Sequence, residues 1–374
     1  MNICIPKERT IEENRVGLTP SGAGALIEAG NNVYIETKAG VGCGFADRDY
    51  ESVGAKIAHS SQEVFKRGDL VVKIGPLLEE ELEQLTEGQT IFAVHHLVVA
   101  SKAVVQKLLN AGIVSVSAEF ITEMDGTLAV VKPASEIAGR MAPQVAAHYL
   151  EAPEGGKGVL LSGLPGVPPA EVVIIGGGVV GRSAAWSFLG AGAHVTILET
   201  NIKVLESLDE AFKGRLATML STPLNLKKAA CYADVVVACV LNRYEEVVPQ
   251  VISRDAVRSM KPRSVILDIS IDMGGCVETS RPTSLRDPVF AEEGVTHYCV
   301  PNIPSAVARS ATHAWTNVTL QFLYEIASRG IDAAASENPV LATGLTTYGG
   351  QVVKEGLARN LSLDYKPLAD LIGK

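Results

Sequence analysis

The sequence predicts an α/β protein built from two doubly wound domains, and three observations support this fold class. Short apolar, β-branched runs that are typical of buried parallel strands alternate with helical segments along the chain. The chain has 374 residues, which is enough for two domains with a hydrophobic core each. It is 47% hydrophobic and 20% charged, as is ordinary for a globular protein.

The first 130 or so residues show this alternation and are expected to form one doubly wound domain. The segment after Arg15 begins a helix near Thr19 and Pro20, because proline is favoured in the first turn. No glycine-rich phosphate loop occurs in this part of the sequence. The expected strands are 2–5, 33–36, 70–74, 90–94 and 114–118, and the expected helices are 60–66, 79–84 and 102–111.

The stretch 171–200 carries the order of elements that binds dinucleotides. An apolar run over 172–175 is followed by Gly176, Gly178 and Gly181 at G-x-G-x-x-G spacing, and then by a helix over about 180–189. The first glycine permits a tight turn, the second lets a pyrophosphate approach the backbone, and the third lets the helix pack closely on the strand. A glycine triplet alone can be an ordinary α/β turn, but the flanking strand and helix favour a nucleotide site.

A carboxylate closes the second strand of this unit and selects the cofactor. The apolar run 195–198 ends at Glu199, which can accept hydrogen bonds from both ribose hydroxyls of an adenosine. The same charge repels a 2′-phosphate. The sequence therefore predicts NAD rather than NADP.

Composition excludes several other classes. The net charge of −9 provides no basic surface for nucleic acid or an anionic membrane. No apolar run reaches the length of a membrane span, and the N-terminal residues are typical of a strand and not of a signal peptide. The six cysteines are scattered without C-x-x-C pairs, which favours the reducing cytoplasm and argues against disulfides or a structural zinc site.

The rest of the chain continues the alternation. A hinge helix over 137–150 and a long loop over 154–169 precede the strand that leads into the glycine motif. The long loop either has a function or only covers the junction between the domains. Asp268 and Asp272 are expected to point to one face at the end of a strand, with a loop cap as the alternative role for Asp272. A long helix from near Arg309 and the remainder to Lys374 return to the first domain. The other expected elements are helices 202–212 and 254–260 and strands 235–241 and 264–271.

Several segments resemble the alanine dehydrogenase and pyridine nucleotide transhydrogenase family, and the dehydrogenase branch more closely. They are ENRVGLTP, GQTIFAVHHLVVAS, SEIAGRMAPQ, GKGVLLSGLPGVPPAEVVIIGGGVVG, DISIDMGGCVETSRPT and PNIPSAVARSATHAWTN. The resemblance implies a Rossmann-like NAD domain, residues 133–308, inserted in a split substrate domain, residues 1–132 and 309–374. It also implies a cytoplasmic homo-oligomer, commonly a hexamer.

The resemblance further implies a site for NAD-dependent oxidative deamination of a small L-amino acid to its 2-oxo acid and ammonium. Arg15 matches the arginine that holds the substrate carboxylate, although a surface ion pair is its alternative role. His96 matches the proton-transferring histidine. Asp272 matches the catalytic aspartate beside the nicotinamide, which helps to bind ammonia or water, and Asn302 matches an active-site asparagine expected to bind the substrate. The matched cofactor contacts are Ser135, Val179, Glu199, Ser221, Val240, Leu241 and Ile269, with Lys203 as a further contact or a solvated helix residue.

The chain departs from the family pattern where the substrate is expected. The family has a substrate-contacting lysine at the position of Gly75, and loss of such a cation ordinarily removes orders of magnitude in rate. Lys73 remains, two residues deeper, as a further candidate for binding the substrate. Ala134 replaces a methionine, Lys132 replaces a small residue, and an extra histidine, His95, precedes His96. Further departures are Met273 and the run 308–313.

Three interpretations follow from these departures. In the first, Lys132 supplies the missing cation and the enzyme remains an amino-acid dehydrogenase, for alanine or for a bulkier or more polar substrate. In the second, NAD is retained but the substrate and the chemistry have changed. In the third, the chain is a catalytically silent NAD-binding subunit, which the retention of Arg15, His96, Asp272 and Asn302 argues against. No metal ion is expected.

Overall fold

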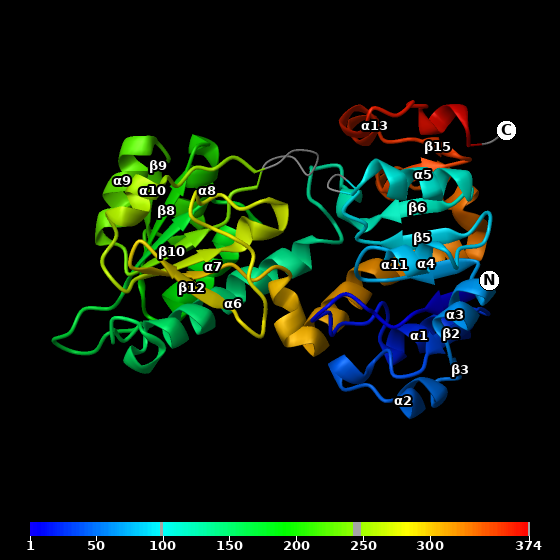
Figure 1. Ribbon diagram of the computed structural model, residues 1–374, viewed down its shortest axis with the longest axis horizontal. Coiled ribbons are helices and arrows are strands. Elements are labelled where there is room, and N and C mark those ends of the chain that lie inside the picture. Colours follow the sequence, from blue (N-terminus) through cyan, green and yellow to red (C-terminus); the bar gives the residue numbers. More distant parts are fainter. Residues whose placement is uncertain (98–99, 242–247, 373–374) are drawn as a thin grey trace. The chain divides into compact units, whose positions relative to one another are not determined.

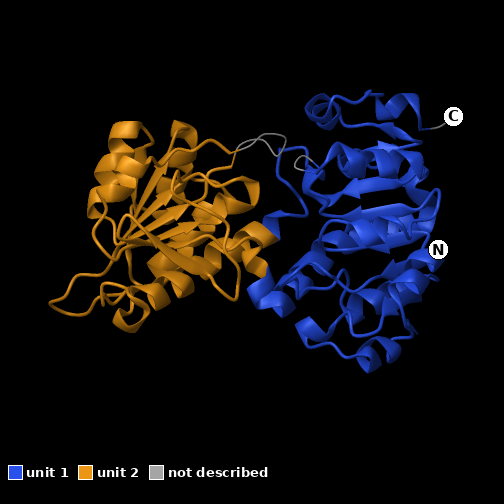
Figure 2. Ribbon diagram, viewed as in Figure 1, with its two compact units in different colours: residues 1–133, 305–374 blue, residues 134–304 orange. Residues whose placement is uncertain are grey.

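The computed structural model describes residues 1–97, 100–241 and 248–372, and the chain divides into two compact units. Unit 1 comprises residues 1–133 and 305–374, and unit 2 comprises residues 134–304 (Figure 2). The sequence-based boundaries, after residues 132 and 308, differ from these by one and four residues. That unit 1 binds substrate and unit 2 binds NAD stays a prediction.

Unit 1 is built on an eight-stranded sheet with the order β15-β14-β6-β5-β4-β1-β2-β3 (Figure 1). All pairs among β1 to β6 are parallel. β14 is antiparallel to both of its neighbours, β6 and β15. The strands are β1 (Asn2–Ile5), β2 (Asn32–Glu36), β3 (Lys56–Ala58), β4 (Leu70–Val72), β5 (Thr90–Ala93), β6 (Val114–Ser117), β14 (Leu345–Tyr348) and β15 (Gln351–Val352).

The C-terminal part of the chain adds two strands to this sheet, β14 and β15, which the sequence analysis did not identify. Thr346 and Thr347 are fully buried, and apolar periodicity gave no sign of a strand there. Their hydroxyl groups are paired instead. The Thr346 hydroxyl lies 2.9 Å from the Ser117 hydroxyl, and Thr347 donates to the Ile113 carbonyl oxygen at 2.8 Å. Polar pairing across the sheet thus replaces apolar contact at this edge.

Helices cover both faces of the unit 1 sheet (Figure 1), as in doubly wound folds. Side-chain caps fix several helix starts: the Thr19 hydroxyl accepts from Gly22 N, and the Ser60 hydroxyl accepts from Glu63 N. The helices are α1 (Pro20–Glu28), α2 (Asp47–Glu51), α3 (Ser61–Arg67), α4 (Glu79–Leu82), α5 (Lys102–Asn110), α11 (Ala308–Glu337, with a break at Gly330), α12 (Pro339–Thr343) and α13 (Glu355–Leu361).

Unit 2 is built on a seven-stranded sheet with the order β12-β13-β11-β10-β7-β8-β9. All neighbours are parallel except β12, which is antiparallel to β13. The strands are β7 (Glu171–Ile175), β8 (His194–Glu199), β9 (Ala217–Leu220), β10 (Val235–Ala238), β11 (Val265–Asp268), β12 (Val289–Glu292) and β13 (Val295–Tyr298).

The helices expected in unit 2 are present, and a further one over Pro223–Tyr232 was not expected. The one over Ile202–Phe212 is capped by the Asn201 side chain, and the next is capped by Thr222. The hinge helix is longer than expected, because it begins at Lys132. The helices are α6 (Lys132–Leu150), α7 (Val179–Gly190), α8 (Ile202–Phe212), α9 (Pro223–Tyr232) and α10 (Arg254–Arg258). The expected fold class, two doubly wound α/β domains, is confirmed.

Candidate active site

The glycine motif forms a tight loop between β7 and α7. Gly176 has a φ of +107°, and a Cβ there would lie 2.6 Å from the Cys239 carbonyl oxygen. A Cβ on Gly181 would lie 1.9 Å from the Gly176 carbonyl oxygen, so helix and strand pack too closely for a side chain. A Cβ on Gly178 would meet no atom within 4 Å. Gly176 and Gly181 are therefore required by the packing of the protein chain. At Gly178 no atom of the protein is close, so a pyrophosphate can approach the backbone there.

Glu199 is held in place by the backbone around it. One carboxylate oxygen accepts from Gly177 N at 2.8 Å, and the other accepts from Thr200 N at 2.7 Å and Asn201 N at 3.0 Å. Burial acts to raise the pKa of this carboxyl, but these hydrogen bonds outweigh burial and leave the pKa below its usual range. The carboxylate is therefore charged at neutral pH. It lies at the end of β8, where it could bind the adenosine ribose.

The other proposed cofactor contacts lie at the carboxyl edge of the unit 2 sheet. The chain leaves β7 towards β8 on one side and reaches β10 on the other, so the glycine loop lies at the switch point of the sheet. Ser221 follows β9, and its N–H donates to the Glu199 carbonyl oxygen at 2.9 Å. The residues that follow β10 and β11 at this edge are Val240, Leu241 and Ile269, and Val179 begins α7. Their contacts with NAD stay predictions.

Asp272 and Asn302 come together in unit 2. The Asp272 carboxylate accepts from the Asn302 backbone N–H at 2.9 Å, and Asn302 has a φ of +55°. The expectation that Asp268 points to the same face as Asp272 was wrong, because β11 ends at Asp268 and a 3-10 turn (η4, Ile269–Met273) follows. Asp268 is buried and accepts from Cys276 N and Val277 N, which fixes the turn. Asp272 is exposed.

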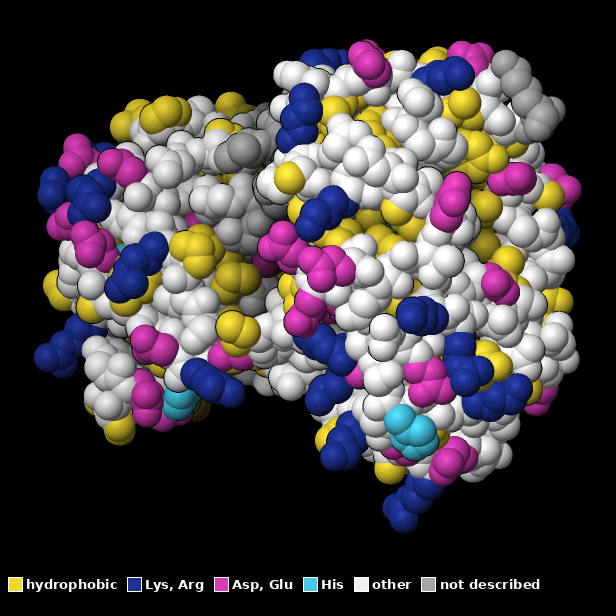
Figure 3. Space-filling view, turned by 45° about the vertical axis from the view of Figure 1, so that its right-hand side comes forward, with side chains coloured by type: hydrophobic (Ala, Val, Ile, Leu, Met, Phe, Trp, Pro, Cys, Tyr) yellow, Lys and Arg dark blue, Asp and Glu magenta, His cyan; other side chains and the backbone are white. Residues whose placement is uncertain are grey.

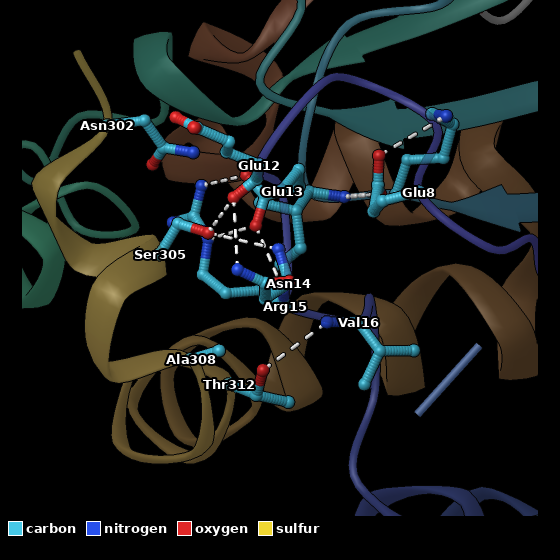
Figure 4. Close-up of polar contacts among 12 residues, drawn as sticks. Glu8, Glu12, Glu13, Asn14, Arg15, Val16, Asn302, Ser305, Ala308 and Thr312 are labelled. Carbon is cyan, nitrogen blue, oxygen red and sulfur yellow. Dashed lines mark hydrogen bonds and ion pairs between the residues drawn. The ribbon is translucent and has the colours of Figure 1, made fainter. Parts of the chain in front are cut away.

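Arg15 lies in unit 1 on the loop between β1 and α1. Its guanidinium forms a bidentate pair with Glu13, at 2.8 and 2.6 Å, and its side chain is 11% exposed (Figure 4). The loop is fixed by the Ser305 hydroxyl, which donates to the Glu12 carbonyl oxygen at 2.5 Å and accepts from Asn14 N at 3.0 Å. This bidentate pair holds the guanidinium in one orientation.

His96 follows β5 in the same unit and has a φ of +50°. Such a backbone conformation is uncommon for a residue other than glycine and is often found at functional sites. Burial, and secondarily the positive charge of Arg15, lowers the pKa of the imidazole. A neutral imidazole near a guanidinium can accept a proton at neutral pH.

Glu119 fixes the backbone of both adjacent histidines. Its carboxylate accepts from His95 N at 3.1 Å and from His96 N at 2.8 Å. Glu119 is 1% exposed, and burial raises its pKa to about 7. His95 is also buried, which lowers its pKa to about 4, and its ring points towards the Ile91 carbonyl oxygen at 3.4 Å. His95 is therefore a neutral interior residue.

The proposal that Lys73 binds the substrate is not supported by the structure. β4 ends at Val72, and the side chain of Lys73 is fully buried. Its Nζ contacts both carboxylate oxygens of Glu81, at 2.7 and 2.9 Å, and lies 3.4 Å from Glu8 Oε2. The two carboxylates compensate the buried charge, so this lysine serves the interior of unit 1.

Three further predicted residues lie on helices. Lys132 is exposed at the start of α6, and Ser135 is in the first turn of the same helix. Lys203 is exposed near the start of α8, where its backbone N–H donates to the Asn201 side chain at 3.0 Å. Their roles towards substrate or NAD stay predictions.

The sequence analysis did not single out Glu8, Glu13 or Glu119. Glu8 and Glu119 follow the buried strands β1 and β6, at the carboxyl edge of a parallel sheet. Asp272 was singled out because sites of open α/β sheets lie at the carboxyl ends of the strands, and the same argument would have indicated Glu8 and Glu119. Glu13 has no comparable signal, because it acts through a local ion pair within an irregular loop.

These features define a class: a two-unit α/β protein with a dinucleotide-binding glycine loop in one unit and an arginine-histidine pair in the other. The model of "Alanine dehydrogenase/PNT, N-terminal domain" matches residues 4–138, and that of "Alanine dehydrogenase/PNT, C-terminal domain" matches residues 142–355. The chain belongs to the alanine dehydrogenase/PNT family.

Named relatives agree over the full length. The chain is 42% identical over 373 residues to an alanine dehydrogenase of Halomonas elongata, with 100% of each chain covered. It is 44% identical over 368 residues to one of Methanococcus maripaludis, with 98% of each covered. A solved L-alanine dehydrogenase superposes with a TM-score of 0.92 at 38% identity, covering 97% of this chain and 99% of that one. A transhydrogenase from Sinorhizobium meliloti shares the fold, with a TM-score of 0.80 at 20% identity, covering 95% and 99%.

Proposed function

We propose that this protein catalyses the reversible, NAD-dependent oxidative deamination of L-alanine, or of a closely related small L-amino acid, to the 2-oxo acid and ammonium. The observation that carries the proposal is an ordered Arg15 whose charge, together with burial, lowers the pKa of His96, in a chain related over its full length to alanine dehydrogenases. NAD, when bound, supplies the hydride acceptor.

Each residue has a chemical task in this proposal. Arg15 binds the substrate carboxylate through its planar fork. His96 takes the proton from the water that attacks the oxidised carbon–nitrogen bond, because burial and Arg15 hold its pKa below the usual range. Asp272 stabilises the cationic nitrogen by its negative charge. Gly178 and Glu199 of unit 2 hold the cofactor at its pyrophosphate and adenosine ribose.

A second candidate is a different amino-acid substrate, favoured by Gly75. A glycine at this position leaves more space and one cation fewer than the family pattern provides, so a larger or more polar side chain can be accommodated. A panel of 2-oxo acids separates the two candidates. Pyruvate is the preferred substrate in the first case, and 3-hydroxypyruvate or 2-oxobutanoate is preferred in the second.

The test is an NADH-oxidation assay with ammonium and this panel, followed by NAD reduction with the corresponding amino acids. Asp272→Asn should lower kcat by about 10²–10³, as loss of one charge-stabilising group does. Asp209→Asn, an exposed aspartate on α8, is the matched control and should not change kcat. NAD binding without turnover of any amino acid would favour the silent subunit and contradict the proposal.

We also propose that the protein is a homo-oligomer of the cytoplasm, with a hexamer as the resemblance implies. All six cysteines are free in the structure and five of them are buried, which suits a reducing compartment. Figure 3 shows acidic and basic side chains interspersed over the visible surface of unit 1, in line with the net charge of −9. Within the described residues, no helix is long and apolar enough to cross a membrane. Sedimentation velocity measures the number of subunits directly.

A further inference from the structure

The loop before α1 carries the proposed substrate arginine, and side chains from a distant part of the chain hold its backbone. Residues 6–19 connect β1 to α1 and contain no helix or strand. Val16 N donates to the Thr312 hydroxyl at 3.3 Å, and Thr19 N donates to the Thr316 hydroxyl at 3.1 Å. Both threonines lie on α11, 296 and 297 residues further along the chain. The backbone of this part of the loop is therefore held by its contacts with α11.

Ser305 holds the part of the same loop on either side of Glu13. It is 2% exposed and lies in η5 (Ile303–Val307), the 3-10 turn before α11. Its hydroxyl donates to the Glu12 carbonyl oxygen at 2.5 Å and accepts from Asn14 N at 3.0 Å (Figure 4). A single hydroxyl thus fixes the two peptide groups that flank Glu13.

The bond to Glu12 supports an uncommon backbone conformation. Glu12 has a φ of +63°. A residue other than glycine keeps such a conformation only where the surrounding structure holds it. The contact of the Ser305 hydroxyl with the Glu12 carbonyl oxygen provides this support. Loss of the hydroxyl should therefore let Glu12 relax and turn the peptide group that precedes Glu13.

Glu13 passes its own orientation on to Arg15. Glu13 Oε1 accepts from the Arg15 backbone N at 2.9 Å and from its Nε at 2.8 Å, and Glu13 Oε2 accepts from Nη2 at 2.6 Å. The Glu13 side chain is 2% exposed and that of Arg15 is 11% exposed, so water screens the pair little. The guanidinium is held at its Nε and Nη2 edge, which sets the direction of the edge formed by Nη1 and Nη2.

We propose that Ser305 is a positioning residue for the substrate carboxylate and that it acts through Glu13 on the orientation of Arg15. This inference deepens the proposed function and rests on it, because Arg15 is the group that binds the carboxylate in that function. Bidentate binding needs the guanidinium and the carboxylate in one plane, so a small rotation of the guanidinium weakens it. Ser305 does not have to touch the substrate for this effect.

Steady-state kinetics of Ser305→Ala provide the first test, with NAD at saturation and the amino acid that the unmodified protein oxidises fastest. KM for the amino acid should rise about tenfold, whereas kcat should change by less than about twofold, because the carboxylate is bound alike in the ground state and the transition state. Ser305→Cys keeps nearly the same size and donates more weakly, so it should raise KM by a smaller factor. An unchanged KM in either folded variant would overturn the proposal.

Thr347→Val is the matched control for the loss of a buried hydroxyl. The Thr347 hydroxyl has the same pattern of bonds as that of Ser305, because it donates to the Ile113 carbonyl oxygen at 2.8 Å and accepts from Ser115 N at 3.1 Å. The control should therefore lower Tm, as Ser305→Ala does, but leave KM and kcat unchanged. A rise in KM in Thr347→Val equal to that in Ser305→Ala would assign both effects to general loss of stability and would contradict a specific role of Ser305.

A double-mutant cycle tests the route through Glu13. Glu13→Gln should raise KM for the amino acid, and Ser305→Ala should add little in the Glu13→Gln background, because the two residues act in series. Increases in KM that multiply in the double variant would show that Ser305 acts by another route. A fall in KM in Glu13→Gln would show that Glu13 competes with the substrate for Arg15, which also overturns the proposal.

Hydrogen exchange, followed by mass spectrometry without NAD or substrate, separates this proposal from the proposed function. Ser305→Ala should speed exchange at the amides of Asn14 and Arg15, and Thr347→Val should leave these amides unchanged. Faster exchange in Ser305→Ala, in a protein that oxidises no amino acid, would contradict the function and leave the hold of Ser305 on the arginine loop intact. Unchanged exchange and KM in Ser305→Ala, in a protein that oxidises alanine, would overturn the positioning role and leave the function intact.

Discussion

Glu119 Oε1 lies 2.8 Å from the backbone nitrogen of His96 and accepts its N–H, so a buried acid on one strand end fixes the conformation of the histidine on the next. The same carboxylate receives the N–H of His95. The two bonds compensate part of the strain of the positive φ at His96. Glu119 is thus a positioning residue for the proton-transferring group.

This arrangement predicts a pH-dependent stability. Burial raises the pKa of Glu119 to about 7, against an unfolded value of 4.5. Between these pH values the unfolded chain has lost the proton and the folded protein still holds it. The contribution of Glu119 to stability is therefore full below about pH 4.5 and is lost as the pH rises through about 7. The shift corresponds to roughly 3 kcal/mol.

The measurement compares urea unfolding of the unmodified protein and Glu119→Gln from pH 4.5 to 8. The unmodified protein should lose stability relative to the variant over this interval, because glutamine does not titrate. Glu123→Gln, an exposed glutamate nearby in sequence, is the control. Parallel stability curves for Glu119→Gln and the unmodified protein would show that Glu119 does not hold a proton near neutrality.

A second prediction concerns the electrostatic contact between Arg15 and His96. The guanidinium lowers the pKa of the imidazole, after the larger effect of burial. Arg15→Gln should therefore raise the pKa of His96, because removal of a like charge favours the imidazolium. Arg48→Gln, in which an arginine with an 88% exposed side chain is changed, is the matched control.

NMR titration of the histidine Cε1–H signals measures the effect. The His96 signal should titrate at higher pH in Arg15→Gln and should not change in Arg48→Gln. An unchanged or lower pKa of His96 in Arg15→Gln would show that Arg15 does not contribute to the low pKa and that burial alone accounts for it.

Much of the fold could be predicted from the sequence because strands β1, β7 and β8 are short apolar runs with clear boundaries. The C-terminal strand β14 could not, because its buried threonines are satisfied by hydroxyl pairs and leave no apolar pattern. In the site, the glycine motif and Glu199 have local signatures. The buried ion pair of Lys73 with Glu81 could not be predicted, because it depends on the packing of α4, which sequence spacing does not show.

A third prediction separates two glycines of one motif. Gly181→Ala would place a Cβ against the Gly176 carbonyl oxygen, so α7 must move and the protein should lose about 1–3 kcal/mol of stability. Gly178→Ala meets open space and should leave Tm almost unchanged. It should still weaken NAD binding about tenfold or more, because the methyl group occupies the approach of the pyrophosphate.

Thermal unfolding without NAD and calorimetric titration with NAD provide the two readouts. Gly190→Ala, at the end of α7 and also facing open space, is the matched control for both. If Gly178→Ala bound NAD as the unmodified protein does, the pyrophosphate would have to lie elsewhere.

The last prediction concerns the choice between NAD and NADP. Glu199 is charged at neutral pH, since the hydrogen bonds from Gly177, Thr200 and Asn201 outweigh burial and keep its pKa low. The substitution Glu199→Gln keeps the shape of the side chain and removes its negative charge. NAD affinity should fall, because a charged acceptor binds ribose hydroxyls more strongly than a neutral one does. NADP affinity should rise, because the repulsion of its 2′-phosphate is gone. The ratio of the two dissociation constants should therefore shift by about tenfold or more towards NADP, whereas Glu206→Gln, an exposed change on α8, should leave it as it is. An unaltered ratio in Glu199→Gln would place the adenosine ribose away from the end of β8, and the assignment of Glu199 would be wrong.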